Sequence, residues 1–278
     1  MKKSIAVIMA HADDIELSAG ATLAKYIHEG YRGLYGVLSR CNSGWTVTEE
    51  AGGHYISSLE IIPQRRAEAE AAAKVFGAEF HYGDLLENCY TTREGTRIMP
   101  SYTGPMGVGE AAINRETIGA DDLPEGALFS TASGAGEPWA GHPVIREVAD
   151  LLVAWEPELV IGQGIGNFNP DHFAAAQIVA IAWQVAAKEA PIGAYWIPVS
   201  PQRAGRLRFP PLRPDRFVDV SGHEETCLRA LACHRSQGGE LPSRLEGRRR
   251  SWAGWREQSG FEATEAFAEI YTPEDLAG

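Results

Sequence analysis

The sequence SIAVIMA at residues 4–10 is short, apolar and partly β-branched, and the polar sequence HADDIE at residues 11–16 follows it directly. A run of this kind is typical of a strand that is buried on both faces in the middle of a parallel sheet. After the polar turn, Leu23 and Ile27 lie among small residues in a segment that ends before Gly30, which predicts a helix with a glycine at its C-terminus. A strand followed by a helix indicates the start of an α/β fold.

The same alternation continues over most of the chain. We expect further strands at residues 33–39, 78–82, 159–163 and 194–199, and helices at residues 63–76, 144–155 and 171–187. Pro63 is predicted to start the first of these helices, and Gly77 to end it. This order predicts a Rossmann-like α/β fold, with a mostly parallel sheet flanked by helices.

We expect a single domain over residues 1–278, with an α/β core up to about residue 200 and a C-terminal extension from about residue 201. Within the extension, residues 261–271 alternate enough to add a late strand. Two stretches, residues 42–62 and 88–141, break the pattern after the carboxyl ends of strands. Because open α/β sheets bind ligands at those ends, the two stretches predict long active-site loops.

Composition excludes several classes of protein. A formal net charge of −12 argues against nonspecific binding to nucleic acid or to anionic membranes. No apolar stretch reaches the about 18 residues that a membrane span needs, and His11 cuts short the apolar run that an export signal would require. The four cysteines lack the CxxC spacing of a thiolate zinc site and suit a reducing compartment. We therefore expect a soluble cytoplasmic protein without nucleic-acid or membrane partners.

The charge is distributed unevenly along the chain. Residues 200–256 hold 12 Arg against 6 acidic residues, so they carry a net charge of +6 while the rest of the chain carries −18. The simpler interpretation, which we favour here, is a solvated surface rich in arginine. The alternative is a patch that binds a phosphate or carboxylate of the substrate.

Residues able to bind a metal follow two of the predicted strands. His11, Asp13 and Asp14 come directly after the first strand, and His172 opens a helix after the predicted strand at residues 159–163. Imidazole and carboxylate ligands suit zinc or ferrous iron, and a catalytic zinc site typically uses three protein ligands and leaves a position for water. A lone histidine at a helix start is more often a simple hydrogen-bonded residue, but the two matching turns together favour a metal site.

These residues form part of a longer series of motifs that resembles the LmbE/PIG-L-like deacetylases, which remove N-acetyl groups from glucosamine-containing compounds. The opening motif of that family is A-H-P-D-D-E, and here Ala12 replaces the proline and Ile15 is inserted before Glu16. Further matches follow in the same order over most of the chain: Arg65-Arg66-Ala67-Glu68, Gly83-Asp84, Asn169-Pro170-Asp171-His172, and residues 230–237 with the sequence ALACHRSQ.

The resemblance implies that His11, Asp14 and His172 bind zinc and that Asp13 is the general base. Zinc lowers the pKa of bound water to about 7, so a nearby carboxylate can take its proton and later return a proton to the departing amine. Ferrous iron is the other metal that these ligands suit. Glu16 is expected to support the site by hydrogen bonding.

One position departs from the family pattern H-P-D-H, because Asn169 replaces the first histidine. In the family that histidine stabilises the oxyanion, and the aspartate, here Asp171, orients it. Asn169 can donate a neutral hydrogen bond but cannot offer an imidazolium, which predicts weaker activity unless another group substitutes. His234 and His142 are the candidates for such a substitute, and we also count His234 among the substrate-binding residues.

For substrate binding, the resemblance places Arg65 or Arg66, together with Asp84, against sugar hydroxyl groups. A guanidinium and a carboxylate can bracket a diol with donors on one side and acceptors on the other. The alternative is structural: an arginine at a helix start that pairs with Glu68, and an aspartate that caps a turn. The expected substrate is a small N-acylated sugar or glycoconjugate, and a homo-oligomer is left open.

The sequence therefore predicts a metal-dependent hydrolase that removes an acyl group, expected to be acetyl, from an N-acetylglucosamine-type conjugate. Two alternatives remain. The first is a ferrous oxygenase with a two-histidine, one-carboxylate site, which the βα context and the unused Asp14 argue against. The second is a metal- and sugar-binding relative with weakened catalysis, to which the change at Asn169 would point.

Overall fold

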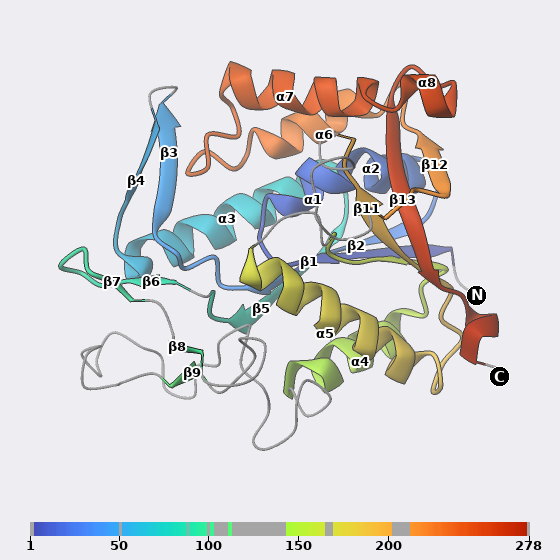
Figure 1. Ribbon diagram of the computed structural model, residues 1–278, viewed down its shortest axis with the longest axis horizontal. Coiled ribbons are helices and arrows are strands. Elements are labelled where there is room, and N and C mark those ends of the chain that lie inside the picture. The colour runs from blue at the N-terminus through green and yellow to red at the C-terminus, as the bar shows by residue number, and fades with distance from the viewer. Residues whose placement is uncertain are drawn as a thin grey trace.

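A seven-stranded sheet forms the centre of the computed structural model, in the strand order β12-β13-β11-β10-β1-β2-β5 (Figure 1). The structure describes residues 3–49, 52–87, 89–98, 101–102, 111–112, 143–164, 169–201 and 212–276. The strands of the sheet are β1 (Ser4–Met9), β2 (Arg32–Ser39), β5 (Glu79–Leu85), β10 (Leu159–Ile161), β11 (Ala194–Val199), β12 (Arg216–Asp219) and β13 (Thr264–Tyr271). Strands β11, β10, β1, β2 and β5 are parallel, whereas β13 runs antiparallel to both β11 and β12. The prediction of a mostly parallel sheet is confirmed.

The position of β1 inside the sheet explains why its sequence is apolar. Ile5 and Val7 belong to the hydrophobic cluster on one face of the sheet, and Ala6 and Ile8 belong to the cluster on the other face. All four side chains are fully buried. Because alternate residues of a strand point to opposite faces, a strand covered on both sides needs an apolar residue at every position.

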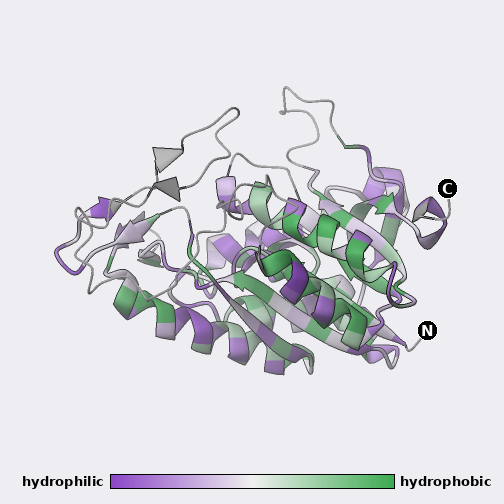
Figure 2. Ribbon diagram, turned by 90° about the horizontal axis from the view of Figure 1, so that it is seen from below, coloured by the Kyte–Doolittle hydropathy of each residue, from purple (hydrophilic) through white to green (hydrophobic). Residues whose placement is uncertain are grey.

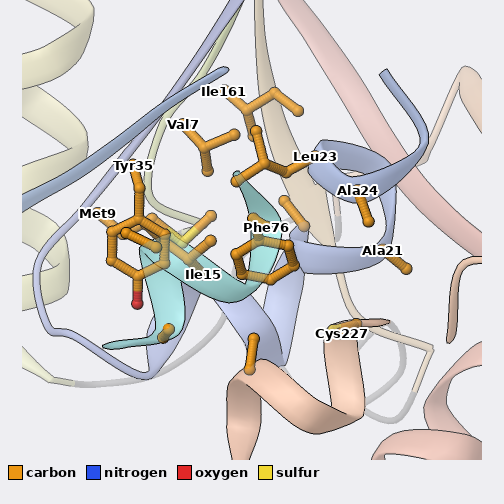
Figure 3. Close-up of a cluster of buried hydrophobic side chains, with 14 of the residues drawn as sticks. Val7, Met9, Ile15, Ala21, Leu23, Ala24, Tyr35, Phe76, Ile161 and Cys227 are labelled. Atoms are coloured by element: carbon orange, nitrogen blue, oxygen red, sulfur yellow. The ribbon is translucent and has the colours of Figure 1, made fainter. Parts of the chain in front are cut away.

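Helices cover both faces of the sheet. One face packs against α1 (Asp14–Ser18), α2 (Gly20–His28), α3 (Ser58–Phe76), α6 (Glu224–Leu231) and α7 (Pro242–Ala253). Figure 3 shows the inner part of this cluster, where Phe76 of α3 and Leu23 of α2 lie against Val7 and Tyr35 of the sheet. The other face packs against α4 (Pro143–Trp155) and α5 (Pro170–Ala186). In Figure 2 the helices carry hydrophobic and hydrophilic residues in turn, as expected where one side of a helix meets a sheet.

The path of the chain through the sheet creates a crevice beside β1. The chain proceeds from β1 to β2 and β5 at one edge, returns to β10 on the other side of β1, and continues outward to β11. The carboxyl ends of β1 and β10 therefore flank a topological switch point, the place where open α/β sheets bind ligands.

Two helix predictions were wrong in detail. The helix α3 begins at Ser58 and has Pro63 inside it, because the Ser57 hydroxyl accepts a hydrogen bond from the Leu59 amide and caps the helix earlier. The segment after the first turn forms two helices, α1 and α2, which Ala19 separates with a nonhelical φ of −139°. The end of α3 at Gly77, with a left-handed φ of 75°, agrees with the prediction.

The two predicted long loops have different outcomes. The stretch at residues 42–62 contains a hairpin of β3 (Trp45–Glu49) and β4 (Gly52–Tyr55), followed by the start of α3. Most of the stretch at residues 88–141 lies outside the described residues, apart from the short strands β6 (Tyr90–Thr91), β7 (Arg97–Ile98), β8 (Ser101–Tyr102) and β9 (Ala111–Ala112).

The C-terminal residues extend the same sheet. The predicted late strand at residues 261–271 is confirmed as β13, and its antiparallel partner β12 was not predicted. A short helix α8 (Arg256–Ser259) precedes β13, and a 3₁₀ turn (Pro273–Leu276) follows it. Among the described helices, none combines the length and apolarity required to cross a membrane.

Candidate metal centre and active site

Three side chains meet at the carboxyl ends of β1 and β10. His11 lies in the turn after β1, Asp14 begins α1, and His172 lies in the first turn of α5. The distances are 3.1 Å from His11 Nδ1 to Asp14 Oδ2, 3.0 Å from His11 Nδ1 to His172 Nε2, and 3.1 Å from His172 Nε2 to Asp14 Oδ2. These residues, called the His–Asp–His cluster below, form a group that could hold a metal ion.

Hydrogen bonds fix the two turns against each other. The Ala10 amide donates to the Gln163 side chain at 2.9 Å, which joins the end of β1 to the segment after β10. The His11 amide donates to Asp14 Oδ2 at 3.0 Å, which closes the first turn. The first bond therefore joins the segments after β1 and β10, and the second orients the Asp14 carboxylate within the cluster.

The other ring nitrogen of His11 faces two carboxylates. His11 Nε2 lies 3.3 Å from Glu87 Oε1 and 3.7 Å from Asp171 Oδ2. Glu87 Oε2 in turn accepts a hydrogen bond from the Ser43 amide at 2.6 Å. Burial lowers the pKa of His11, but the Glu87 and Asp14 carboxylates outweigh that effect and raise this pKa well above its ordinary value.

Glu87 was not predicted from the sequence. It lies 5% exposed just beyond β5, which ends at Leu85. The available signal was its place after a parallel strand, since the carboxyl ends of parallel strands share one edge of a sheet. No short motif marks it.

Asp13 lies beside the cluster and is paired with two arginines. Arg65 donates to Asp13 Oδ1 at 2.8 Å, and Arg244 lies 3.3 Å from Asp13 Oδ2. Burial raises the pKa of Asp13, but Arg65 outweighs it and lowers this pKa to about 2. Asp13 is therefore ionised at neutral pH and held in a fixed orientation. Arg244 was not predicted individually, although it belongs to the arginine-rich stretch of residues 200–256.

The predicted sugar-binding residues are divided between the site and the surface. Arg65 is buried against Asp13, and its Nη1 also lies 3.9 Å from Glu68 Oε2. Arg66 is exposed, with its guanidinium 5.5 Å from the centre of the Tyr82 ring. Asp84 is also exposed and lies 3.3 Å from Arg40. Of the pair Arg65 and Arg66, the structure brings Arg65 into the site, and a diol bracket with Asp84 stays a prediction.

Glu16 and His234 form a buried group behind the first turn. Glu16 accepts a hydrogen bond from the Tyr35 hydroxyl at 3.0 Å and lies 3.3 Å from His234 Nε2, and both Glu16 and His234 are fully buried. The Tyr35 hydroxyl oxygen also lies within hydrogen-bond distance of the Ala12 carbonyl in the turn itself, so its single proton is shared between these two acceptors. With no exposed surface, His234 supports the turn from behind, and its contact with substrate stays a prediction.

Asn169 caps α5. Its side-chain oxygen accepts a hydrogen bond from the Asp171 amide at 2.9 Å, which is the usual role of asparagine at this position. The Asp171 carboxylate faces His11. The oxyanion role of Asn169 and the orienting role of Asp171 stay predictions, and His142 lies outside the described residues.

A pocket of about 390 Å³ opens beside the cluster. Asp14 and His172 line one part of it, and residues of α7 line another. The volume lies within the usual range for small-molecule sites. The site can therefore combine a metal-binding group, a fixed carboxylate and space for a small ligand.

Comparisons with known proteins show which family this chain resembles. The family model described as PIG-L, GlcNAc-PI de-N-acetylase, matches residues 6–183. A diacetylchitobiose deacetylase from Thermococcus kodakarensis is 26% identical over 236 residues, which cover 84% of this chain and 70% of that protein.

Two solved structures show the same fold. The 4-carboxy-2-hydroxymuconate hydratase of Pseudomonas putida KT2440 aligns with a TM-score of 0.62 at 18% identity, over 98% of this chain and 97% of that one. The N,N'-diacetylchitobiose deacetylase of Pyrococcus horikoshii aligns with a TM-score of 0.60 at 18% identity, over 99% and 86%. The family match spans most of the chain and includes both turns of the His–Asp–His cluster. This chain belongs to the PIG-L family of GlcNAc-PI de-N-acetylases.

Proposed function

We propose that this protein is a zinc-dependent hydrolase that removes an acetyl group from the amide nitrogen of an N-acetylglucosamine-type sugar conjugate. The observation that carries the proposal is the His–Asp–His cluster with the ionised Asp13 beside it, at the switch point of the sheet. Membership of the PIG-L family supports the reaction, as does the likeness to a protein described as a diacetylchitobiose deacetylase.

The residues present fit zinc. Two imidazole nitrogens and one carboxylate oxygen are a common ligand set for catalytic zinc, and they leave a fourth position open. A tetrahedral ion with bonds of about 2.0–2.1 Å separates its ligand atoms by roughly 3.3 Å, close to the 3.0–3.1 Å between these atoms. When bound, zinc lowers the pKa of water to about 7 and polarises a carbonyl group.

Asp13 supplies the proton transfers in this proposal. It would accept a proton from the attacking water and give a proton to the departing amine nitrogen. A carboxylate with a pKa of about 2 is a weak base, so its contribution depends on its position. Arg65 and Arg244 hold both carboxylate oxygens and so fix that position.

Glu87 would support the same reaction through His11. A carboxylate that accepts the second N–H of a ligating histidine fixes the orientation of the ring and makes it a stronger ligand. With Nε2 facing Glu87, His11 is left to bind the ion through Nδ1.

The ferrous oxygenase is the weaker alternative. The ligand atoms alone suit ferrous iron as well as zinc, but the family and its deacetylase relative support hydrolysis. Since the fold is shared with a protein described as a hydratase, the fold by itself does not select the reaction.

An acetate-release screen tests the proposal. The protein is prepared metal-free, loaded with one equivalent of zinc or ferrous iron, and incubated with N-acetylglucosamine, N,N'-diacetylchitobiose and larger N-acetylglucosamine conjugates. We expect equal amounts of acetate and free amine from at least one substrate, with zinc and without oxygen. Oxygen consumption with ferrous iron and no acetate release would support the oxygenase instead.

A further inference from the structure

The part of the pocket lining that α7 contributes is rich in arginine. Arg244, Arg248 and Arg250 of α7 all line the same 390 Å³ pocket as Asp14 and His172. Apart from those cluster residues and the arginines, the described lining residues are small, apolar or hydroxylated, together with Gln163, and Glu265 is the one further acidic residue among them. Of the described lining residues outside the cluster, Glu265 is therefore the carboxylate that could neutralise these arginines.

Glu265 is already saturated by other partners. Its carboxylate forms an ion pair with Arg248 and accepts a hydrogen bond from the Trp252 indole N–H at 3.2 Å. It also accepts hydrogen bonds from the backbone amides of Ala21 and Thr22 at the start of α2. With four donors directed at it, Glu265 offers little attraction to further cations, so Arg244 and Arg250 find their carboxylate contacts elsewhere, at Asp13 and Glu246.

The arginines, by contrast, have unused donors. The Nε of Arg248 is buried without a hydrogen-bond partner among the described residues, and the Arg248 side chain is 3% exposed. Among the described residues, the ion-pair partner of Arg250 is the exposed Glu246, at 3.8 Å. Arg244 contacts Asp13 and the Gln237 carbonyl, each at 3.3 Å. The Nε of Arg248 is closed to solvent, whereas Arg244 and Arg250 keep guanidinium N–H groups that an anion in the pocket could engage.

We infer that the substrate of this site carries an anionic group, a carboxylate or a phosphate, which binds against Arg244 and Arg250 on α7. Guanidinium groups recognise both anions through paired, charge-assisted hydrogen bonds. This inference rests on the proposed function, because it places the N-acyl group of the same molecule at the His–Asp–His cluster. The pocket volume suits a ligand of about the size of one substituted sugar.

The arginine stretch of residues 200–256 thus has two parts. The exposed Arg249 follows Arg248 on the same helix but does not line the pocket, as expected for a solvated surface residue. Arg244 and Arg250 fit the alternative interpretation, a patch for a phosphate or carboxylate. The matched pair Arg250 and Arg249 separates the two interpretations, since both are exposed arginines of α7.

Calorimetric binding to the metal-free, full-length protein tests the inference without any contribution from zinc. The probes are N-acetylglucosamine, N-acetylglucosamine 6-phosphate and N-acetylmuramic acid, which are neutral, phosphorylated and carboxylated. We expect at least one anionic sugar to bind about tenfold or more tightly than the neutral one, and the stronger of the two identifies the anion.

The variants Arg244→Gln and Arg250→Gln should each reduce that preference by about tenfold, while Arg249→Gln leaves it unchanged. Melting temperatures confirm that each variant is folded. Equal binding of neutral and anionic sugars, or an equal effect of Arg249→Gln and Arg250→Gln, would overturn the inference.

The same probes distinguish this inference from the proposed function. If acetate is released from neutral and anionic substrates with the same kcat/KM, the result supports the deacetylase activity and contradicts the anion-binding site. If an anionic sugar binds in an arginine-dependent way but no substrate releases acetate, the result supports the anion-binding site and contradicts the deacetylase activity.

Discussion

The turns after β1 and β10 occupy equivalent places in the sheet but use their side chains differently. In the first turn, His11, Asp13 and Asp14 all point into the site. In the second, His172 reaches the cluster, whereas the side-chain oxygen of Asn169 caps its own helix. The first turn therefore directs three polar side chains into the site, whereas the described polar residues of the second turn are divided between the site and the helix cap.

The difference shows how a shared edge of the sheet builds a site from distant residues. Neighbouring parallel strands end at the same edge, so His11 and His172 come within 3.0 Å although 161 residues separate them in sequence. The contact depends on the order of strands, with β10 beside β1. The predictions below test whether the two turns act as one metal site, starting with the largest expected effect.

Removing a ligand from either turn should abolish tight zinc binding. We expect His172→Ala and His11→Ala each to weaken zinc binding by at least about a hundredfold, because even partners outside the ligand set are worth about 10- to 100-fold. The measurement is zinc per chain after dialysis against a weak chelator. Asp13→Asn is the control and should retain one zinc. Full zinc occupancy in folded His172→Ala would show that the second turn does not bind the metal.

A variant of Asp13 should lose catalytic rate while it still binds zinc. A general base typically contributes about 10²- to 10⁴-fold to the rate, so Asp13→Asn is expected to lower kcat by that amount with zinc retained. Arg65→Lys replaces the guanidinium that donates to Asp13 Oδ1 but keeps the positive charge, and a smaller loss of kcat is expected from it. Turnover near the wild-type value in Asp13→Asn would place the base elsewhere.

Glu87 should affect the metal through His11. The variant Glu87→Gln cannot accept the His11 N–H as a charged partner, and we expect zinc affinity to fall by about 10- to 100-fold. Competition with a chelator of known zinc affinity measures the change. Asp84→Asn serves as a control, since Asp84 is an exposed carboxylate on β5 that pairs with Arg40. An equal effect of the two variants would remove the positioning role of Glu87.

Asn169 should show the smallest effect, and two of its variants distinguish its two roles. Loss of the helix cap in Asn169→Ala is expected to lower the free energy of unfolding by about 1 kcal/mol, whereas Asn169→Asp keeps a capping oxygen and most of that stability. Chemical denaturation measures both.

Kinetics then address the oxyanion prediction. If Asn169 donates to the oxyanion, both variants should lower kcat with little change in KM, because aspartate caps the helix but cannot donate while ionised. Wild-type kcat in both variants would leave Asn169 with the capping role alone.

Much of the fold could be predicted from the sequence because its signals are local. The apolar run of β1 and the glycine after α3 each reflect a requirement of nearby backbone. The early start of α3 was missed because the cap at Ser57 outweighed the proline signal at Pro63. The strand β12 was missed because it depends on pairing with β13, about 48 residues away along the chain.

The candidate site likewise contains some residues that the sequence predicted and others that it did not. The three residues of the cluster lie in short motifs, and the structure brings them together. Glu87 and Arg244 reach the site through tertiary packing; no short motif marks Glu87, and the arginine-rich stretch does not single out Arg244 among its twelve arginines. His234 lies in a short motif and is fully buried beside Glu16, and the substrate contact expected of it stays a prediction.

Anomalous diffraction at the zinc edge, from crystals grown with one equivalent of zinc, tests the central claim most directly. The account predicts a single strong peak bound by His11 Nδ1, Asp14 and His172 Nε2, with His11 Nε2 directed at Glu87. Zinc bound at any other group of residues, or a peak that lacks a ligand from the second turn, would contradict it.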